Sequence, residues 1–277
     1  MSYQRILTVQ DISCVGQCSM TVALPILSAC GHETCVLPAA VLSTHTGGFT
    51  NPVKLDLGDV MGDIWQHWQR EGIGFDAIYT GYLGSVKQVE ETKKMIAAMK
   101  AEGGLVIVDP AMADHGKLYK GLDDNYRQAM QELCFRSDIM MPNMTESCMM
   151  TGIPLKENYD QAYITQILDK LSAMGAKSVL LTGVGFAADE TGFALLHNGE
   201  IFWYQHEKLD KAYHGTGDIF ASAFVGALMR GKDRYQAGVI AAQYTAHCIR
   251  CTMEGRTHWY GVRFEAALPK LMEMLAL

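Results

Sequence analysis

Short apolar, β-branched runs alternate along this chain with longer stretches of helical periodicity. Six runs are continuously apolar, as in strands covered on both faces: RILTVQ, TCVLPAAVL, DAIYTGYL, LVIVDPAM, DIMMPN and KSVLLTGVG. Helical patterns lie between and after them, at roughly 19–29, from 59, 85–101, 125–135, 158–173, 216–229 and 234–251. This alternation predicts an α/β fold with a mostly parallel central sheet flanked by helices.

The alternation of strand and helix patterns ends after Thr191, where GFALLHNGEIFWYQ contains two strand-like runs separated by Asn198 and Gly199. That dipeptide favours a tight turn, so we expect an antiparallel hairpin at one edge of the sheet. No long Pro/Ser linker, internal repeat or low-complexity tract divides the sequence. We therefore expect a single domain that covers residues 1–277.

Composition argues against several classes of partner. The chain has 23 basic and 30 acidic residues, a net charge of −7, and no long cluster of basic residues, so we expect no nucleic acid partner. It has no apolar run of membrane-spanning length and no signal-peptide pattern, which favours a cytoplasmic protein without a membrane partner. The eight cysteines lie mostly in apolar periodic segments and indicate reduced core thiols. The CxxC at Cys248 and Cys251 has no second pair, so no metal is inferred from cysteine.

Polar residues follow most of the predicted strands, and ligands of such sheets bind beyond the carboxyl ends of the strands. Asp109 can start a turn before Pro110, Asn143 can cap a helix, and Tyr82 can lie in the core. Convergence of many such residues on one edge indicates a ligand site instead. The candidates are Asp11 and Ser13 in the turn after the first strand, His45 and Thr46 in the loop after the second, then Tyr82, Asp109, Asn143, Glu146 and Thr182.

The stretch YHGTGDIFASAFVGALMRG opens a predicted helix with two glycines and one acid. Gly215, Thr216 and Gly217 leave backbone N–H groups open at the helix N-terminus, where the dipole favours an anion such as phosphate. No GxxxxGK[ST] motif occurs, so this is not a P-loop. Asp218 could accept a proton from an attacking hydroxyl group, which contributes roughly 10²- to 10⁴-fold in rate. The alternative is that Asp218 only complements the helix dipole, worth about 0.3–1 kcal/mol.

Together these segments resemble the pyridoxal kinase branch of the ribokinase-like superfamily over essentially the whole chain. GTGD at 215–218 is similar to the superfamily's anion hole and catalytic base, and NMTE at 143–146 to its magnesium-associated NxxE motif. STHT, TGYLGS and DPAM are similar to pyridoxal kinase segments. The resemblance implies a three-layer ribokinase-like sandwich. It also implies an ATP-dependent kinase that phosphorylates the 5′-hydroxymethyl group of pyridoxal, pyridoxamine or pyridoxine in the salvage of pyridoxal phosphate.

The resemblance further implies a role for each candidate residue. A monovalent cation, usually K⁺, and a homodimer are expected with it. Mg²⁺ would be bound partly through water, because it sheds its waters reluctantly. The implied roles are Asp218 as base, the N–H groups of Gly215, Thr216, Gly217 and Asp218 on the γ-phosphoryl group, Asp109 and Glu146 on Mg²⁺ and ATP, Asn143 and Thr182 on the ATP phosphates, and His45, Thr46 and Tyr82 around the pyridine ring.

One position departs from the family pattern. Where pyridoxal kinases have Ser-His after the glutamine of the first strand, this chain has Gln10, Asp11, Ile12 and Ser13. The family's serine contacts the substrate ring, so Asp11 meets the ring nitrogen or the 3-hydroxyl group, or Ser13 substitutes. An acid at this place leaves the preferred vitamer open, with pyridoxamine or a hydroxymethylpyrimidine as possibilities.

Three other functions remain as alternatives. A hydroxymethylpyrimidine kinase would share the anion hole and DPAM, although THT and GYLGS favour a vitamin B6 substrate. An NAD-dependent dehydrogenase is suggested by GVGFAAD, which mimics GxGxxA but reads poorly as a helix. A non-catalytic nucleotide-binding protein would keep the fold alone. The loops at 44–52 and 114–121 are candidates for a lid, which would predict slow hydrolysis of ATP without acceptor.

Overall fold

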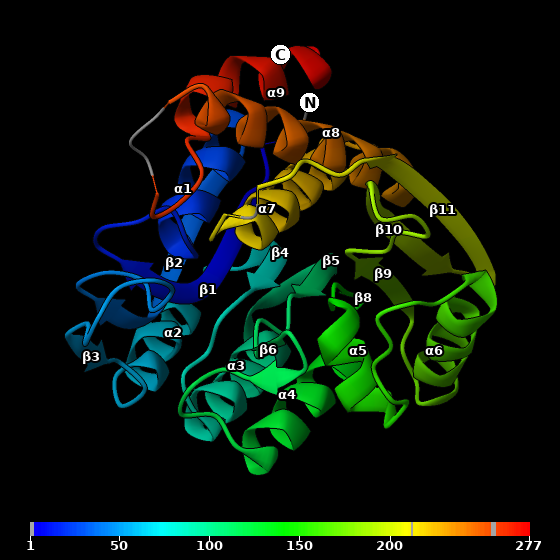
Figure 1. Ribbon diagram of the computed structural model, residues 1–277. Helices are drawn as coiled ribbons and strands as arrows, with labels where there is room; N and C mark the ends of the chain where they lie inside the picture. Colours follow the sequence, from blue (N-terminus) through cyan, green and yellow to red (C-terminus); the bar gives the residue numbers. More distant parts are fainter. Residues whose placement is uncertain (1–2, 212, 256–258) are drawn as a thin grey trace.

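A twisted sheet of nine strands runs through the residues that the computed structural model describes, 3–211, 213–255 and 259–277. Its strand order is β11-β10-β9-β8-β5-β4-β1-β2-β3 (Figure 1). The neighbours from β9 to β2 pair in parallel, whereas β10, β11 and β3 are antiparallel. The strands are β1 Arg5–Ser13, β2 Glu33–Leu42, β3 Lys54–Asp56, β4 Phe75–Thr80, β5 Lys100–Val108, β8 Ile139–Met140, β9 Ser178–Thr182, β10 Glu190–His197 and β11 Glu200–Glu207, with a separate hairpin of β6 Ala113–Asp114 and β7 Lys117–Leu118.

Helices cover both faces of this sheet and complete three layers (Figure 1). One face carries α2 Met61–Arg70, α3 Val86–Met99, α4 Asp124–Arg136, α5 Met144–Thr151 and α6 Gln161–Ala173. The other carries α1 Met20–Ala29, α7 Thr216–Met229, α8 Arg234–Met253 and α9 Leu268–Met274, the last preceded by a 3₁₀ turn at Glu265–Ala267. The predicted three-layer α/β sandwich is therefore confirmed.

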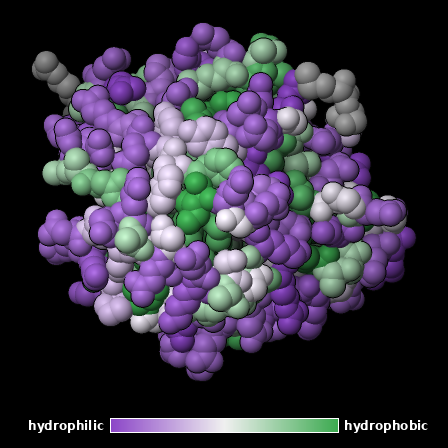
Figure 2. All heavy atoms as spheres, turned by 90° about the vertical axis from the view of Figure 1, so that its right-hand side faces the viewer, coloured by the Kyte–Doolittle hydropathy of each residue, from purple (hydrophilic) through white to green (hydrophobic). Residues whose placement is uncertain are grey.

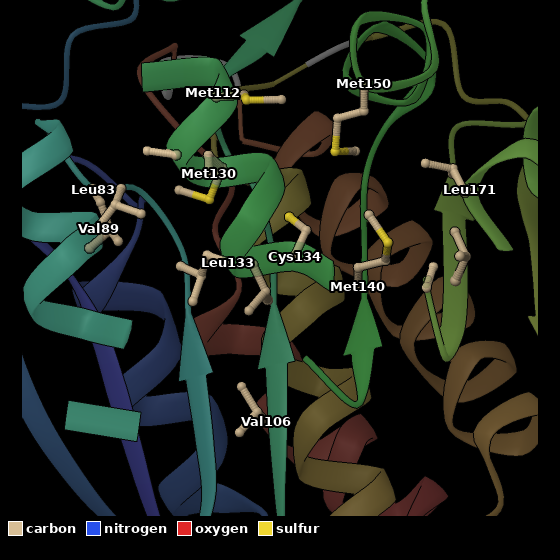
Figure 3. Close-up of a cluster of buried hydrophobic side chains, with 14 of the residues drawn as sticks. Leu83, Val89, Val106, Met112, Met130, Leu133, Cys134, Met140, Met150 and Leu171 are labelled. Carbon is tan, nitrogen blue, oxygen red and sulfur yellow. The ribbon is translucent and has the colours of Figure 1, made fainter. Parts of the chain in front are cut away.

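Two apolar cores lie between the sheet and the two helical layers, and they explain why the strand sequences are continuously apolar. Figure 3 shows part of the first core, where Val106 of β5 and Met140 of β8 face Leu133 and Cys134 of α4. The second core lies on the opposite face of the sheet and is built around α1, α7 and α8, with Phe224 fully buried. Because each central strand contributes side chains to both cores, neither of its faces needs to be polar.

The predicted hairpin at 192–205 is present as β10 and β11. Asn198 and Gly199 form its turn with positive φ angles of 52° and 81°, and His197 pairs with Glu200 on either side of them. Two positive φ values in a two-residue loop match the right-handed twist of the flanking strands. Gly199 adopts this conformation without a steric penalty, and Asn198 tolerates it better than most residues.

Several local predictions are corrected by the structure. Asp11 and Ser13 belong to β1 and not to a turn, because β1 continues to Ser13 beside an irregular stretch of β2 in which Gln10 pairs with Pro38 and Ile12 with Val41. A second antiparallel strand, β3, covers the opposite edge, although only one antiparallel edge was predicted. The helices α5 and α9 and the hairpin β6–β7 were not predicted, since each is too short for periodicity to reveal.

The surface on the β11 side is largely hydrophilic, with separate smaller hydrophobic areas among the polar side chains (Figure 2). No helix among the described residues is long and apolar enough to cross a membrane. The C-terminus follows α9, on the helical layer that contains α7 and α8 (Figure 1).

Candidate active site

The candidate residues gather where the parallel strands end and α7 begins. Asp109 directly follows β5, Tyr82 follows β4 by two residues, and Thr182 is the last residue of β9. Thr182 also forms an isolated parallel bridge with Asn143, which brings the ends of β8 and β9 together. The predicted convergence on one edge of the sheet is confirmed, as parallel topology requires.

The start of α7 presents open backbone donors. Gly215 is the N-cap residue with φ of 85°, and the first intrahelical bond runs from Ile219 N–H to the Gly215 carbonyl at 3.0 Å. The N–H groups of the intervening residues therefore have no acceptor within the helix. The Thr216 hydroxyl group turns away and donates to the Tyr213 carbonyl at 3.2 Å. This helix end can bind an anion through its backbone alone.

Gly215 cannot be replaced by a residue with a side chain at this place. A Cβ atom on Gly215 would lie 1.9 Å from the Gln17 carbonyl oxygen and 3.5 Å from the Cys18 sulfur. At Gly217, by contrast, a Cβ atom would meet nothing within 4 Å, so the space in front of the first turn is open. The loop after β1 thus packs directly beneath the anion-binding end of α7.

Asp218 lies in the first turn of α7 and points into an acidic environment. Burial raises the pKa of its carboxyl group to about 7, the Ser19 backbone N–H opposes this, and the nearby Asp109 and Asp11 raise it further. A carboxyl group with a pKa near neutrality can accept a proton and release it again at physiological pH. A carboxyl group whose pKa is raised by burial and by neighbouring carboxyl groups is typical of a functional site.

Glu146 holds the backbone around Asp109 in place. Its side chain is 2% exposed, and it accepts hydrogen bonds from the N–H groups of Met112 at 2.8 Å, Ala113 at 3.3 Å and Asn143 at 2.9 Å. Asp109 Oδ1 accepts from Ala111 N–H at 3.0 Å. Burial raises the pKa of both carboxyl groups, and for Asp109 the charge of Glu146 adds to the rise.

Asn143 and Glu146 together form a capping box at the start of α5. Asn143 Oδ1 accepts from Glu146 N–H at 2.9 Å, while Asn143 Nδ2 donates to the Ala113 carbonyl at 2.8 Å. The NMTE motif therefore has a structural role, and the spacing of Asn and Glu is the sequence signal that could have revealed α5. A contact of Asn143 and Thr182 with nucleotide phosphates stays a prediction.

Asp11 and Ser13 lie together at the end of β1. Asp11 is 3% exposed and its Oδ2 accepts from the Ser13 hydroxyl group at 3.0 Å. Burial raises the pKa of Asp11, and the Ser19 and Ser13 hydroxyl groups oppose this effect. Tyr82 is half-buried nearby, where burial and then the charge of Asp11 raise the pKa of its hydroxyl group.

His45 is fixed in one tautomer by two backbone contacts. Its Nδ1 accepts from Gly47 N–H at 3.1 Å, so Nε2 carries the proton that it donates to the Tyr260 carbonyl. The His45 ring packs against Phe49 at 5.0 Å and His214 at 5.2 Å between centroids. Thr46, the next residue, is exposed. The loop after β2 is thereby tied to two segments that lie far along the chain.

Sequence reasoning missed several residues of this edge. Ser19 faces both Asp11 and Asp218, and its φ of 53° is unusual for a residue with a side chain. Trp259 and Tyr260 join the cluster through Phe49, at 4.9 and 5.9 Å between ring centroids. No local pattern predicts the latter two, since only tertiary packing brings 259–260 to the loop after β2.

The conformation of the GVGFAAD segment excludes the dehydrogenase alternative. GVGFAAD forms an irregular loop between β9 and β10, and no helix N-terminus follows it to bind a pyrophosphate. Within the described part of the chain, no three His, Cys, Asp or Glu side chains form a group that could hold a metal ion.

Comparison with known proteins gives a consistent result. The matching family model is that of phosphomethylpyrimidine kinase, and it covers residues 27–262. A pyridoxal kinase of Dictyostelium discoideum is 24% identical over 241 residues, 82% of this chain and 78% of its own. The pyridoxal kinase PdxY of Histophilus somni is 28% identical over 278 aligned positions, 94% of this chain and 91% of its own.

Solved structures are similar over nearly the whole chain. A candidate phosphomethylpyrimidine kinase from Bacteroides thetaiotaomicron superposes with a TM-score of 0.93 at 32% identity, covering 98% of this chain and 94% of that one. A second crystal form of that protein, with pyridoxal, superposes with a TM-score of 0.90 at 33% identity, covering 98% of this chain and 96% of that one. The pyridoxal kinase of Lactobacillus plantarum superposes with a TM-score of 0.91 at 32% identity, covering 99% of this chain and 98% of that one.

Proposed function

Because the chain belongs to the phosphomethylpyrimidine kinase family of ribokinase-like proteins, we propose that it phosphorylates the 5′-hydroxymethyl group of a vitamin B6 vitamer with ATP. The observation that carries this proposal is Asp218, a carboxyl group with a pKa near 7 at the open N-terminus of α7. A carboxyl group beside open backbone N–H groups supports a proton acceptor next to an anion site.

The reaction follows from these two features. The vitamer's 5′-oxygen attacks the γ-phosphorus of ATP as its proton passes to Asp218, and the bond from that phosphorus to the β–γ bridging oxygen breaks to release ADP. The N–H groups at 215–218 stabilise negative charge on the transferring group, and removal of one such donor typically costs about 10²- to 10³-fold in rate. Positioning and charge stabilisation supply most of the catalysis in phosphoryl transfer.

The residues present fit a magnesium ion that is bound mainly by water and ATP. Backbone N–H groups occupy one lone-pair position of Asp109 and three of Glu146, so Glu146 has little capacity left for direct ligation. Mg²⁺ commonly keeps several waters and uses one or two carboxylates with substrate phosphates. Asp109 would hold it, Glu146 would accept from its waters, and the ion would neutralise phosphate charge. The requirement for K⁺, the homodimer and the cytoplasmic location remain part of the proposal.

The acceptor is proposed to be a vitamin B6 vitamer, with hydroxymethylpyrimidine as the second candidate. The Bacteroides thetaiotaomicron protein, which is 33% identical to this chain, was crystallised with pyridoxal, and this supports the first choice. The family description supports the second. His45, Thr46 and Tyr82 would surround the acceptor ring in either case.

Acceptor-dependent formation of ADP tests the proposal. The purified protein, with ATP, Mg²⁺ and K⁺, is assayed with pyridoxal, pyridoxamine, pyridoxine and hydroxymethylpyrimidine in parallel. Turnover of a B6 vitamer with formation of its 5′-phosphate is the expected result. Turnover of the pyrimidine alone would favour the second candidate, and ATP binding without any turnover would identify a non-catalytic nucleotide-binding protein.

A further inference from the structure

Asp11 is a buried acid whose charge the described protein does not neutralise. It accepts a hydrogen bond from the Ser13 hydroxyl group at 3.0 Å, but among the residues that the structure describes no Lys, Arg or His lies within ion-pair distance of it. Lys54 favours the Asp11 anion from further away and itself pairs with Asp56 at 3.7 Å. Burying a carboxylate without a cationic partner is unfavourable, so a ligand with positive charge would be stabilised beside it.

Ser19 connects Asp11 to the proposed base. It is the N-cap residue of α1 with φ of 53° and ψ of −125°, yet its side chain makes no capping hydrogen bond. Instead Ser19 forms an isolated antiparallel bridge with Ile12, the neighbour of Asp11. Its hydroxyl group lowers the pKa of Asp11, and its backbone N–H lowers the pKa of Asp218. Such a conformation persists only where surrounding structure enforces it. Ser19 therefore lies near both carboxyl groups, and Asp11 is close enough to Asp218 for its charge to raise the pKa of Asp218.

We propose that Asp11 recognises the ring substituent next to the reacting hydroxymethyl group and selects acceptors in which that substituent is an amine. This inference rests on the proposed function. In B6 vitamers the neighbour of the 5′-hydroxymethyl group is an aldehyde, an alcohol or an aminomethyl group, whereas the ring nitrogen lies further away. With the hydroxymethyl group at Asp218, the aminomethyl group of pyridoxamine lies at Asp11, where its ammonium supplies the missing positive charge.

The test compares acceptors in the wild-type protein and in Asp11→Asn, which keeps the size of the side chain and removes its charge. We expect wild-type kcat/KM to favour pyridoxamine over pyridoxine by about tenfold or more, as for a charge-assisted hydrogen bond. Asp11→Asn should lower kcat/KM for pyridoxamine about ten- to a hundredfold more than it lowers kcat/KM for pyridoxine. Asp11→Glu, which retains the charge, should retain the preference for the amine.

Other outcomes would overturn the inference. An equal loss for all vitamers in Asp11→Asn would assign the residue a structural role, and a wild-type preference for the aldehyde or alcohol would contradict it directly. Calorimetric titration of pyridoxamine and pyridoxine separates this question from catalysis. If no B6 vitamer is turned over, the proposed function fails, while amine-selective binding that is lost in Asp11→Asn still supports the inference and unselective binding overturns it.

Discussion

At the scale of single residues, Asp218 decides whether the site is catalytic. Asp218→Asn keeps the shape of the side chain but cannot accept the proton, so kcat should fall about 10²- to 10⁴-fold while KM for ATP changes little. In the wild-type protein, kcat/KM for the acceptor should decline below a pH near 7, because only the ionised carboxylate is a base. Steady-state kinetics between pH 5 and 9 measure both effects. A flat profile with a fully active Asn variant would assign Asp218 to the helix dipole alone.

The same residue should reduce stability when it is ionised. The pKa of Asp218 rises from an ordinary value of 3.8 to about 7 on folding, so the folded protein binds more protons than the unfolded chain between these values. The loss of folding stability caused by ionised Asp218 therefore begins as pH rises above about 4 and is complete above about 7. Asp218→Asn should unfold at a higher temperature than the wild-type protein at pH 8, and the difference should shrink toward pH 4. Equal thermal shifts at both pH values would contradict this account.

At the scale of elements, the start of α7 depends on Gly215. Gly215→Ala places a methyl group against the Gln17 carbonyl in a conformation with φ of 85°, and we expect a loss of about 1–3 kcal/mol or more. Gly217→Ala is the matched control, because its methyl group meets no atom within 4 Å. That variant should unfold in urea like the wild-type protein but turn over at least about tenfold more slowly, since its methyl group enters the phosphate space.

The capping box of α5 should contribute to both stability and activity. Glu146→Ala removes the acceptor for three backbone N–H groups and should cost about 2–3 kcal/mol in urea unfolding, with a loss of turnover as the segment after Asp109 loosens. Asp160 is the control, since it caps another helix, α6, by accepting from Tyr163 N–H at 2.9 Å. Asp160→Ala should cost about 1 kcal/mol and leave kcat unchanged. Equal effects of the two variants on kcat would contradict a specific role for Glu146.

Helices and strands were predictable from the sequence where a long segment repeats one apolar pattern or where a short motif defines a turn. The central strands and the hairpin at Asn198 and Gly199 follow directly from apolar runs and turn chemistry. The ends of the strands were less predictable, because β1 carries the polar residues Asp11 and Ser13 inside the sheet. Their burial depends on the irregular pairing with β2 and on Ser19, which are tertiary features that no local pattern reveals.

At the scale of the whole molecule, the site is assembled from segments far apart in the sequence. The convergence of strand ends was predictable because parallel topology dictates it. The aromatic cluster of His45, Phe49, Trp259 and Tyr260 was not, since it joins the loop after β2 to the segment that precedes α9. A loop held by rings and by the His45 contact to the Tyr260 carbonyl is a candidate for the predicted lid at 44–52.

Trp259 should report on that loop when acceptor binds. Trp259 is 58% exposed and its ring centroid lies 4.9 Å from that of Phe49, so a movement of the loop onto the acceptor changes the polarity around the indole. We expect vitamer binding to shift tryptophan emission in the wild-type protein, and Trp259→Phe to remove the shift. Trp68→Phe is the control, because Trp68 lies on α2 and packs against Phe75 of β4, outside the aromatic cluster of Trp259. If the shift survives in Trp259→Phe and disappears in Trp68→Phe, the loop after β2 is not the element that closes, and slow hydrolysis of ATP without acceptor needs another explanation.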